Sequence, residues 1–163
     1  MKVEQIAVPQ ASLLHRYVAQ DGAYTDCFQV VIAKSATHSE FVQAFYTTWL
    51  FRLERCVLAL ALRRRISDEE VSALADDRSN RFAVWHVEAR SENQMLLADN
   101  SGHTKSFLAL EALETGSVRL IFGSAVVTKG KQKLSRLVRA TIWLHRLYSI
   151  GLLKAAALRL QRG

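Results

Sequence analysis

The sequence is poor in the residues that usually separate domains. It holds one proline, Pro9, and seven glycines, and no segment rich in glycine, serine or proline divides the chain. No internal repeat is present, and 163 residues is the length of one ordinary domain. We therefore expect residues 1–163 to form a single domain.

Cysteine is equally scarce. The two cysteines, Cys27 and Cys56, lie in apolar stretches, and neither has a second cysteine or a histidine at metal-ligand spacing. None of the five histidines is paired with a cysteine, histidine or carboxylate at such spacing either. We expect buried free thiols, no metal site and no cofactor.

Several motifs of common enzyme and membrane classes are missing. Gly116 and Gly123 are isolated, which argues against a phosphate-binding loop, and the run around Ser124 lacks the second glycine of a nucleophile elbow. The N-terminus has no apolar signal region. Arginine and lysine interrupt the longest apolar stretch, 137–160, and each costs about 2.5 to 3.5 kcal/mol at a bilayer centre. We expect a cytoplasmic protein without a membrane span.

The spacing of apolar residues does predict secondary structure. Alternation predicts a strand at 24–33, and helical spacing follows, with Ser39 and Ser67 as helix caps and a helix at 51–64. A long 3.6-residue period at 132–160 predicts a C-terminal helix with one apolar face. Between these helices lie four further strand-like segments with short polar turns: 82–90, 94–100, 105–113 and 117–127.

This order predicts an α+β fold. Four strands joined by turns of hairpin length form an antiparallel meander, and helices must cover one face of the sheet. The expected architecture is an antiparallel sheet of about five strands packed on a long C-terminal helix.

The order of elements is similar to the helix-grip architecture of the START-like (SRPBCC-type) superfamily. Three motifs resemble a bacterial family of this kind whose function is uncharacterised: Tyr24-Thr25-Asp26-Cys27-Phe28, Phe122-Gly123-Ser124-Ala125-Val126-Val127 and His145-Arg146-Leu147-Tyr148. The resemblance covers most of the chain from Tyr24 onward. It implies a curved sheet around the C-terminal helix, often enclosing an apolar cavity, although larger members have seven strands.

The main functional hypothesis follows from that resemblance. We expect a small apolar or amphipathic ligand to bind between the sheet and the C-terminal helix. The residues expected to contact it are Phe82, Val84, His86, Leu97, Asp99, Leu108, Phe122, Leu144, His145 and Tyr148.

A second hypothesis is a cyclase-like enzyme that uses the same cavity for proton transfer. His86, Asp99 and His145 are its candidate acids and bases, because histidine titrates near neutral pH and burial raises the pKa of a carboxyl group. The structural alternatives stay open: a core histidine bonded to backbone or water, and an aspartate that caps a turn.

A third hypothesis rests on charge. From Lys129 onward the chain holds nine lysines and arginines and no acid, within a net charge of +7. A basic amphipathic helix suits a peripheral module that binds an anionic membrane surface or another protein, although a solvated helix face gives the same pattern. Nucleic acid is disfavoured, because no aromatic pair interleaves with basic residues on a predicted strand.

Overall fold

The structure is a computed structural model that describes residues 1–63, 66–114, 116–127 and 136–163. Its helices are the 3-10 helix η1 (Leu13–Tyr17) and the α-helices α1 (His38–Tyr46), α2 (Trp49–Leu62), α3 (Asp68–Ala75) and α4 (Arg136–Arg162). Its strands are β1 (Glu4–Gln5), β2 (Tyr24–Ile32), β3 (Arg81–Phe82), β4 (Trp85–Ser91), β5 (Gln94–Asp99), β6 (Thr104–Ala112) and β7 (Val118–Val126).

The described strands form one antiparallel sheet in the order β1-β2-β7-β6-β5-β4-β3. The sheet has seven strands rather than the expected five or so, because β1 and β3 add two residues each at its edges. The expected strand at 82–90 is divided between β3 and β4. Ala83 has a φ of 53°, in the left-handed region, so the chain turns between Phe82 and Trp85.

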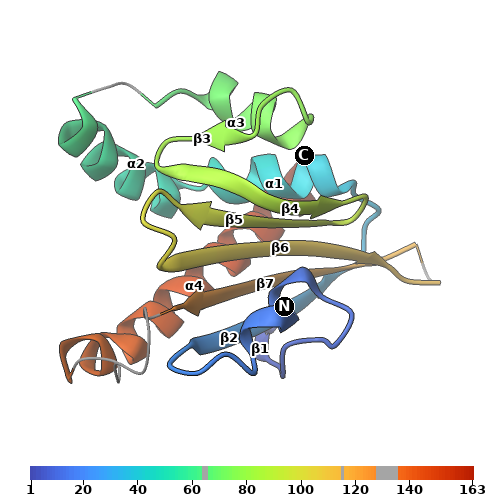
Figure 1. Ribbon diagram of the computed structural model, residues 1–163. Coiled ribbons are helices and arrows are strands. Elements are labelled where there is room, and N and C mark those ends of the chain that lie inside the picture. Colours follow the sequence, from blue (N-terminus) through green and yellow to red (C-terminus); the bar gives the residue numbers. More distant parts are fainter. Residues whose placement is uncertain (64–65, 115, 128–135) are drawn as a thin grey trace.

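All four α-helices lie on one face of the sheet, and α4 runs obliquely across it (Figure 1). The main core fills the space between the two layers. Phe28 and Leu120 from the sheet, Phe41 and Phe45 from α1, and Leu153 from α4 are each at most 1% exposed. The sequence prediction of an α+β helix-grip fold is therefore confirmed.

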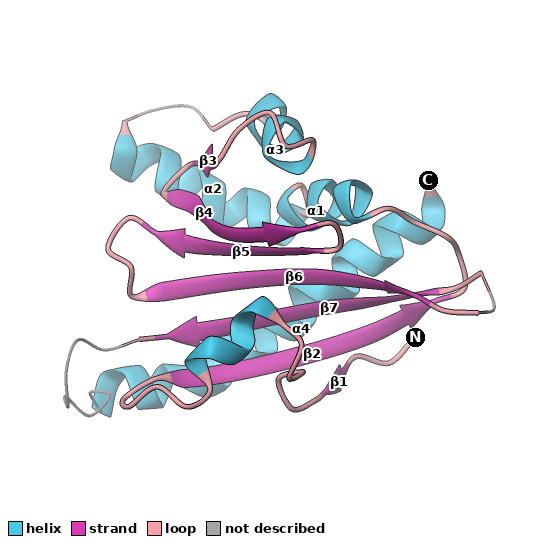
Figure 2. Cartoon of the chain, turned by 45° about the vertical axis from the view of Figure 1, so that its right-hand side comes forward, coloured by secondary structure: helices cyan, strands magenta, loops and turns pink. Residues whose placement is uncertain are grey.

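The opposite face of the sheet is covered by the N-terminal segment and η1, as Figure 2 shows. Leu14 of η1 is fully buried against Cys27, Phe107 and Ile121, in a second, smaller core. Gly123 lies under this helix, because a Cβ atom there would meet Leu14 Cδ2 at 2.5 Å. Both faces of the sheet are thus buried.

Helix caps fix the start of two helices. Thr37, not the predicted Ser39, is the N-cap of α1, and it forms a capping box with Glu40. Ser39 instead donates a hydrogen bond to Asp76 at 2.8 Å. The prediction of Ser67 as the cap of α3 is confirmed.

Helix α4 extends to Arg162, and residues 132–135 of the predicted helix lie outside the described residues. Its C-terminal end is fastened to the rest of the fold. The Arg159 guanidinium donates to the Thr47 carbonyl at 3.0 Å, and Lys34 donates to the Leu160 carbonyl at 3.0 Å.

In the described parts of the chain, no helix is long and apolar enough to cross a bilayer.

Candidate ligand pocket

A pocket of about 300 Å³ lies between the sheet, α2 and α4. Aromatic and aliphatic side chains form most of its wall, and a few polar groups interrupt them. The apolar and aromatic lining is Phe45, Phe51, Trp85, Phe122, Tyr148 and Leu152. The polar residues of the lining are Glu54, Thr104, Lys105, Ser106, Ser124 and His145. The Lys105 ammonium itself binds Glu88 and lies over the Tyr17 ring, on the face covered by η1.

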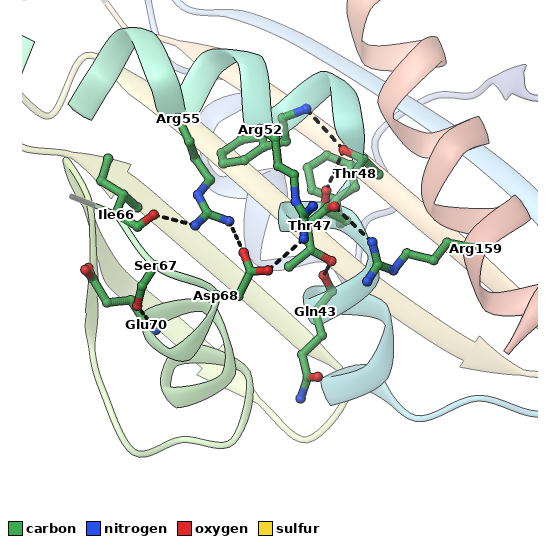
Figure 3. Close-up of polar contacts among 12 residues, drawn as sticks. Gln43, Thr47, Thr48, Arg52, Arg55, Ile66, Ser67, Asp68, Glu70 and Arg159 are labelled. Atoms are coloured by element: carbon green, nitrogen blue, oxygen red, sulfur yellow. Dashed lines mark hydrogen bonds and ion pairs between the residues drawn. The ribbon is translucent and has the colours of Figure 1, made fainter. Parts of the chain in front are cut away.

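Helix α2, which forms one wall, is held in place by ion pairs to α3. Figure 3 shows Arg55 reaching both the Asp68 carboxylate and the Ile66 carbonyl, while Arg52 binds the same carboxylate at 2.7 Å. The Arg55 side chain is only 8% exposed. The hydrogen bond from Arg55, helped by Arg52, lowers the pKa of Asp68, so the carboxylate is charged at neutral pH. These contacts fix the face of α2 that carries Glu54.

Glu54 and Tyr148 join α2 to α4 across the pocket. The Tyr148 hydroxyl donates a hydrogen bond to the Glu54 carboxylate. Burial raises the pKa of Glu54, although the bond from Tyr148 and the charge of His145 act in the opposite direction. Burial and the adjacent Glu54 also raise the pKa of Tyr148. Glu54 is therefore a carboxyl group that exchanges its proton closer to neutral pH than an exposed glutamate does.

A second polar chain runs from the sheet into the pocket. The Asp26 side chain on β2 is fully buried and accepts a hydrogen bond from the Ser124 hydroxyl at 2.6 Å. Ser124 Oγ lies 2.9 Å from His145 Nε2 on α4, and that nitrogen is 3.8 Å from Asp26 Oδ2. Tyr24 also donates to Asp26, at 3.3 Å.

The direction of these bonds fixes the tautomer of His145. The Ser124 hydroxyl has a single proton, which it donates to Asp26. Ser124 Oγ must then accept from His145, whose Nε2 therefore carries a proton. Nδ1 has no hydrogen-bond partner within the described segments, and it is the nitrogen of His145 left for a ligand.

Three further polar groups lie at or near the pocket wall. The Tyr46 hydroxyl and Ser106 Oγ are 3.1 Å apart and satisfy each other. The Nε1 atom of Trp85 is buried and has no hydrogen-bond partner in the described structure. Trp85 is the lining residue with an unsatisfied donor.

Six of the ten residues predicted from the sequence lie on the helix-covered side of the sheet. Three of them line the pocket: Phe122, His145 and Tyr148. The other three are buried in the main core: Phe82, Leu97 and Leu108.

The remaining four predicted residues lie elsewhere. His86 is opposite Ala98, which is opposite Lys105 in the next strand, so all three side chains point to the face covered by η1. Leu144 is 57% exposed on α4. Val84 lies in the turn before β4, where its carbonyl accepts from the backbone N–H of Asn100.

Asp99 caps the turn after β5 and does not line the pocket. It accepts from the Ser101 hydroxyl at 2.5 Å and from the Thr104 backbone N–H at 3.0 Å. Burial acts to raise the pKa of Asp99, but these hydrogen bonds together lower it. Asp99 is therefore charged at neutral pH and unsuited to the acid role.

Sequence reasoning missed Asp26, Ser124, Glu54 and Trp85. Two of them carried a detectable signal. Asp26 shares its inward face with Phe28 and Val30, and Ser124 shares its face with Phe122, so each is a polar residue in an otherwise apolar alternation. A polar residue at a core position of a strand indicates a buried hydrogen bond or a site.

The described residues include no group of three or more histidine, cysteine, aspartate or glutamate side chains placed to hold a metal ion.

Comparisons with known proteins support no family assignment. No family model matches the sequence, and no curated protein matches it. Among solved structures, the chain is similar to the one titled "Crystal structure of Ara h 8.0201", with a TM-score of 0.44 and 12% identity, covering 87% of this chain and 100% of that chain. The helix-grip assignment rests on the order of the elements and the pairing of the strands described above.

Proposed function

We propose that the protein binds a small amphipathic molecule in the pocket between the sheet, α2 and α4. The observation that carries this proposal is the buried, unpartnered Nε1–H of Trp85, a residue of the pocket wall. Leaving a buried donor unpaired costs about 1 to 3 kcal/mol. A ligand whose carbonyl or hydroxyl oxygen accepts from this N–H, once the indole turns to open it to the pocket, removes that cost.

The other lining residues limit the size and polarity of the ligand. A volume of about 300 Å³ suits a molecule of one or two rings, and the wall of Phe45, Phe51 and Phe122 favours an apolar body. Glu54 supplies a carboxylate that accepts hydrogen bonds, and His145 supplies one further ring nitrogen that can form a hydrogen bond. The ligand class is a compact apolar molecule with one or two oxygen functions.

The test compares two probes that differ in one oxygen. The probes are 2-tetralone and tetralin, which lacks the carbonyl group, and the readout is the NMR signals of the three tryptophan indole N–H groups. We expect 2-tetralone to move the Trp85 signal and to bind about tenfold more tightly than tetralin, the worth of one hydrogen bond. The signals of Trp49 and Trp143, which are 65% and 63% exposed, stay in place.

Two variants serve as controls for that experiment. Trp85→Phe removes the donor and abolishes the preference for 2-tetralone, whereas Trp143→Phe changes an exposed side chain and preserves the preference. If neither probe binds up to its solubility limit, the proposal is wrong.

An anionic membrane surface is a second candidate partner. Helix α4 exposes Trp143, Leu144 and Leu147, each more than half accessible, in a segment whose only charges are positive. We expect co-sedimentation with vesicles of phosphatidylserine and phosphatidylcholine that weakens in salt. Equal sedimentation with pure phosphatidylcholine vesicles would argue against this candidate.

A further inference from the structure

We propose that the pocket catalyses proton transfer at a small carbonyl compound, with the Glu54 carboxylate as the base and the protonated His145 side chain as the acid. The proposal rests on the proposed function, because the substrate occupies the same pocket. It goes beyond binding, because it assigns a reaction to two residues that line the same pocket from different helices.

Glu54 has the features of a base in an apolar site. It comes from α2, which Arg55 and Arg52 tie to Asp68, and Tyr148 holds its carboxylate by a hydrogen bond. The lining around it is largely aromatic, so the carboxylate is poorly solvated. Its raised pKa makes it a stronger proton acceptor than an exposed glutamate.

His145, on α4, has the features of an acid in the same pocket. Its Nε2–H is directed at Ser124 Oγ, and behind Ser124 lies the buried Asp26 carboxylate. That arrangement orients the ring and leaves Nδ1 for the ligand, the nitrogen that carries the second proton when the ring is protonated. Glu54 and His145 are close enough for their charges to interact. Asp26 and Ser124 are positioning residues.

The proposed step is an enolisation and needs no further reactant. The Glu54 carboxylate takes a proton from the carbon next to the carbonyl group, and the electrons of that C–H bond form a carbon–carbon double bond. The carbonyl π electrons move to oxygen, which takes the Nδ1 proton of His145. In D₂O the protonated Glu54 exchanges its proton with the solvent while the enol is bound. Reversal of the step then places a deuteron on the same carbon, returns the oxygen's proton to His145 Nδ1 and restores the carbonyl group.

The same geometry rules out Ser124 as the nucleophile of a hydrolase triad. In such a triad histidine accepts the serine proton and the carboxylate binds the far side of the histidine ring. Here the serine lies between the other two, and its proton goes to Asp26 at 2.6 Å. Proton transfer is the chemistry that this order of groups supports.

The experiment measures hydrogen–deuterium exchange at the carbons beside the carbonyl group of 2-tetralone in D₂O, followed by proton NMR with the buffer rate subtracted. We expect the protein to accelerate exchange about 100-fold or more, as general acid–base catalysis does. Glu54→Gln and His145→Gln each remove nearly all of the acceleration. Ser124→Ala lowers kcat about tenfold and leaves KM within about twofold, because it acts through His145 and not on binding.

Matched controls use the same residue types away from the pocket. His86→Gln, on the opposite face, and Glu92→Gln, in the exposed turn after β4, retain the wild-type rate. Exchange at the buffer rate while 2-tetralone still shifts the Trp85 signal overturns catalysis and leaves ligand binding intact. Absence of both binding and exchange overturns both proposals, and full activity in Glu54→Gln or His145→Gln overturns the assignment of the two residues.

Discussion

Glu54 lies where burial disfavours its charged form. Its pKa in the folded protein is above the value of about 4.5 for a free glutamate, so the folded state holds this proton more tightly than the unfolded state. Below the unfolded pKa both states are protonated, and Glu54 has no effect on stability. As pH rises through and above the folded pKa, the ionised carboxylate makes the folded state less stable.

Replacing this carboxylate therefore has an effect that depends on pH. Glu54→Gln increases the free energy of unfolding at about pH 8 and leaves it nearly unchanged at about pH 4, in urea titrations. Glu92→Gln, at an exposed position, is the control and changes stability at neither pH. An equal gain for Glu54→Gln at both pH values would contradict the burial of its charge. A variant that is stable but inactive would separate the catalytic role from folding.

Two glycines give a second test at the residue scale. An alanine Cβ at position 123 would lie 2.5 Å from Leu14 Cδ2 and 3.0 Å from the Asp26 carbonyl oxygen. We expect Gly123→Ala to cost about 1 to 3 kcal/mol in urea unfolding, because buried η1 must shift.

The matched substitution lies in α4. At Gly151 the nearest atom to a new Cβ is Leu50 Cδ1 at 3.8 Å, an ordinary contact. Gly151→Ala gains about 0.5 to 1 kcal/mol from helix propensity. Similar effects of the two substitutions would mean that η1 does not pack on the sheet as described.

The sequence predicted side-chain direction only where the alternation of a strand is unbroken. Phe122 and Leu108 lie inward as predicted, because β6 and β7 pair without interruption over nine residues. His86, like Phe82 two alternations earlier in the expected strand 82–90, was predicted to contact the ligand. The left-handed turn at Ala83 breaks that alternation, so His86 points to the other face. Glu54 is far from the sheet in sequence, and no local pattern could show that it lines the same pocket as His145.

At the scale of elements, the start of α1 depends on Thr37. Its hydroxyl accepts from the Glu40 backbone N–H at 3.2 Å, and the Glu40 carboxylate accepts from the Thr37 backbone N–H at 2.7 Å. Thr37→Ala removes one half of the capping box and costs about 1 kcal/mol, measured by thermal or urea unfolding. Ser39→Ala leaves the cap in place, so it lowers the free energy of unfolding by less than Thr37→Ala does. A larger loss of stability for Ser39→Ala than for Thr37→Ala would show that Ser39 is the cap.

Most elements could be predicted because each has its own period. The strands 94–100, 105–113 and 117–127 agree with β5, β6 and β7 to within one residue at each end. Strand β1 and helix η1 could not be predicted. They are two and five residues long, too short to show a period, and they depend on contacts with the sheet.

At the scale of the whole molecule, we propose that residues 1–163 unfold as one domain. Helix α4 packs on β2 and β7, and β2 joins the N-terminal β1 to the sheet, so the two ends of the chain share one core. Far-ultraviolet circular dichroism and tryptophan fluorescence should give one coincident thermal transition. Two separate transitions would indicate independent units.

The two thiols differ in accessibility, which gives the native protein a single reactive sulfur. Cys27 is buried beneath Leu14, and burial raises its pKa to about 12, so it stays protonated and unreactive. Cys56, predicted to be buried, is exposed on α2, two residues from Glu54. A maleimide fluorophore can therefore be attached to the unmodified chain at one defined point, on the helix that forms one wall of the pocket.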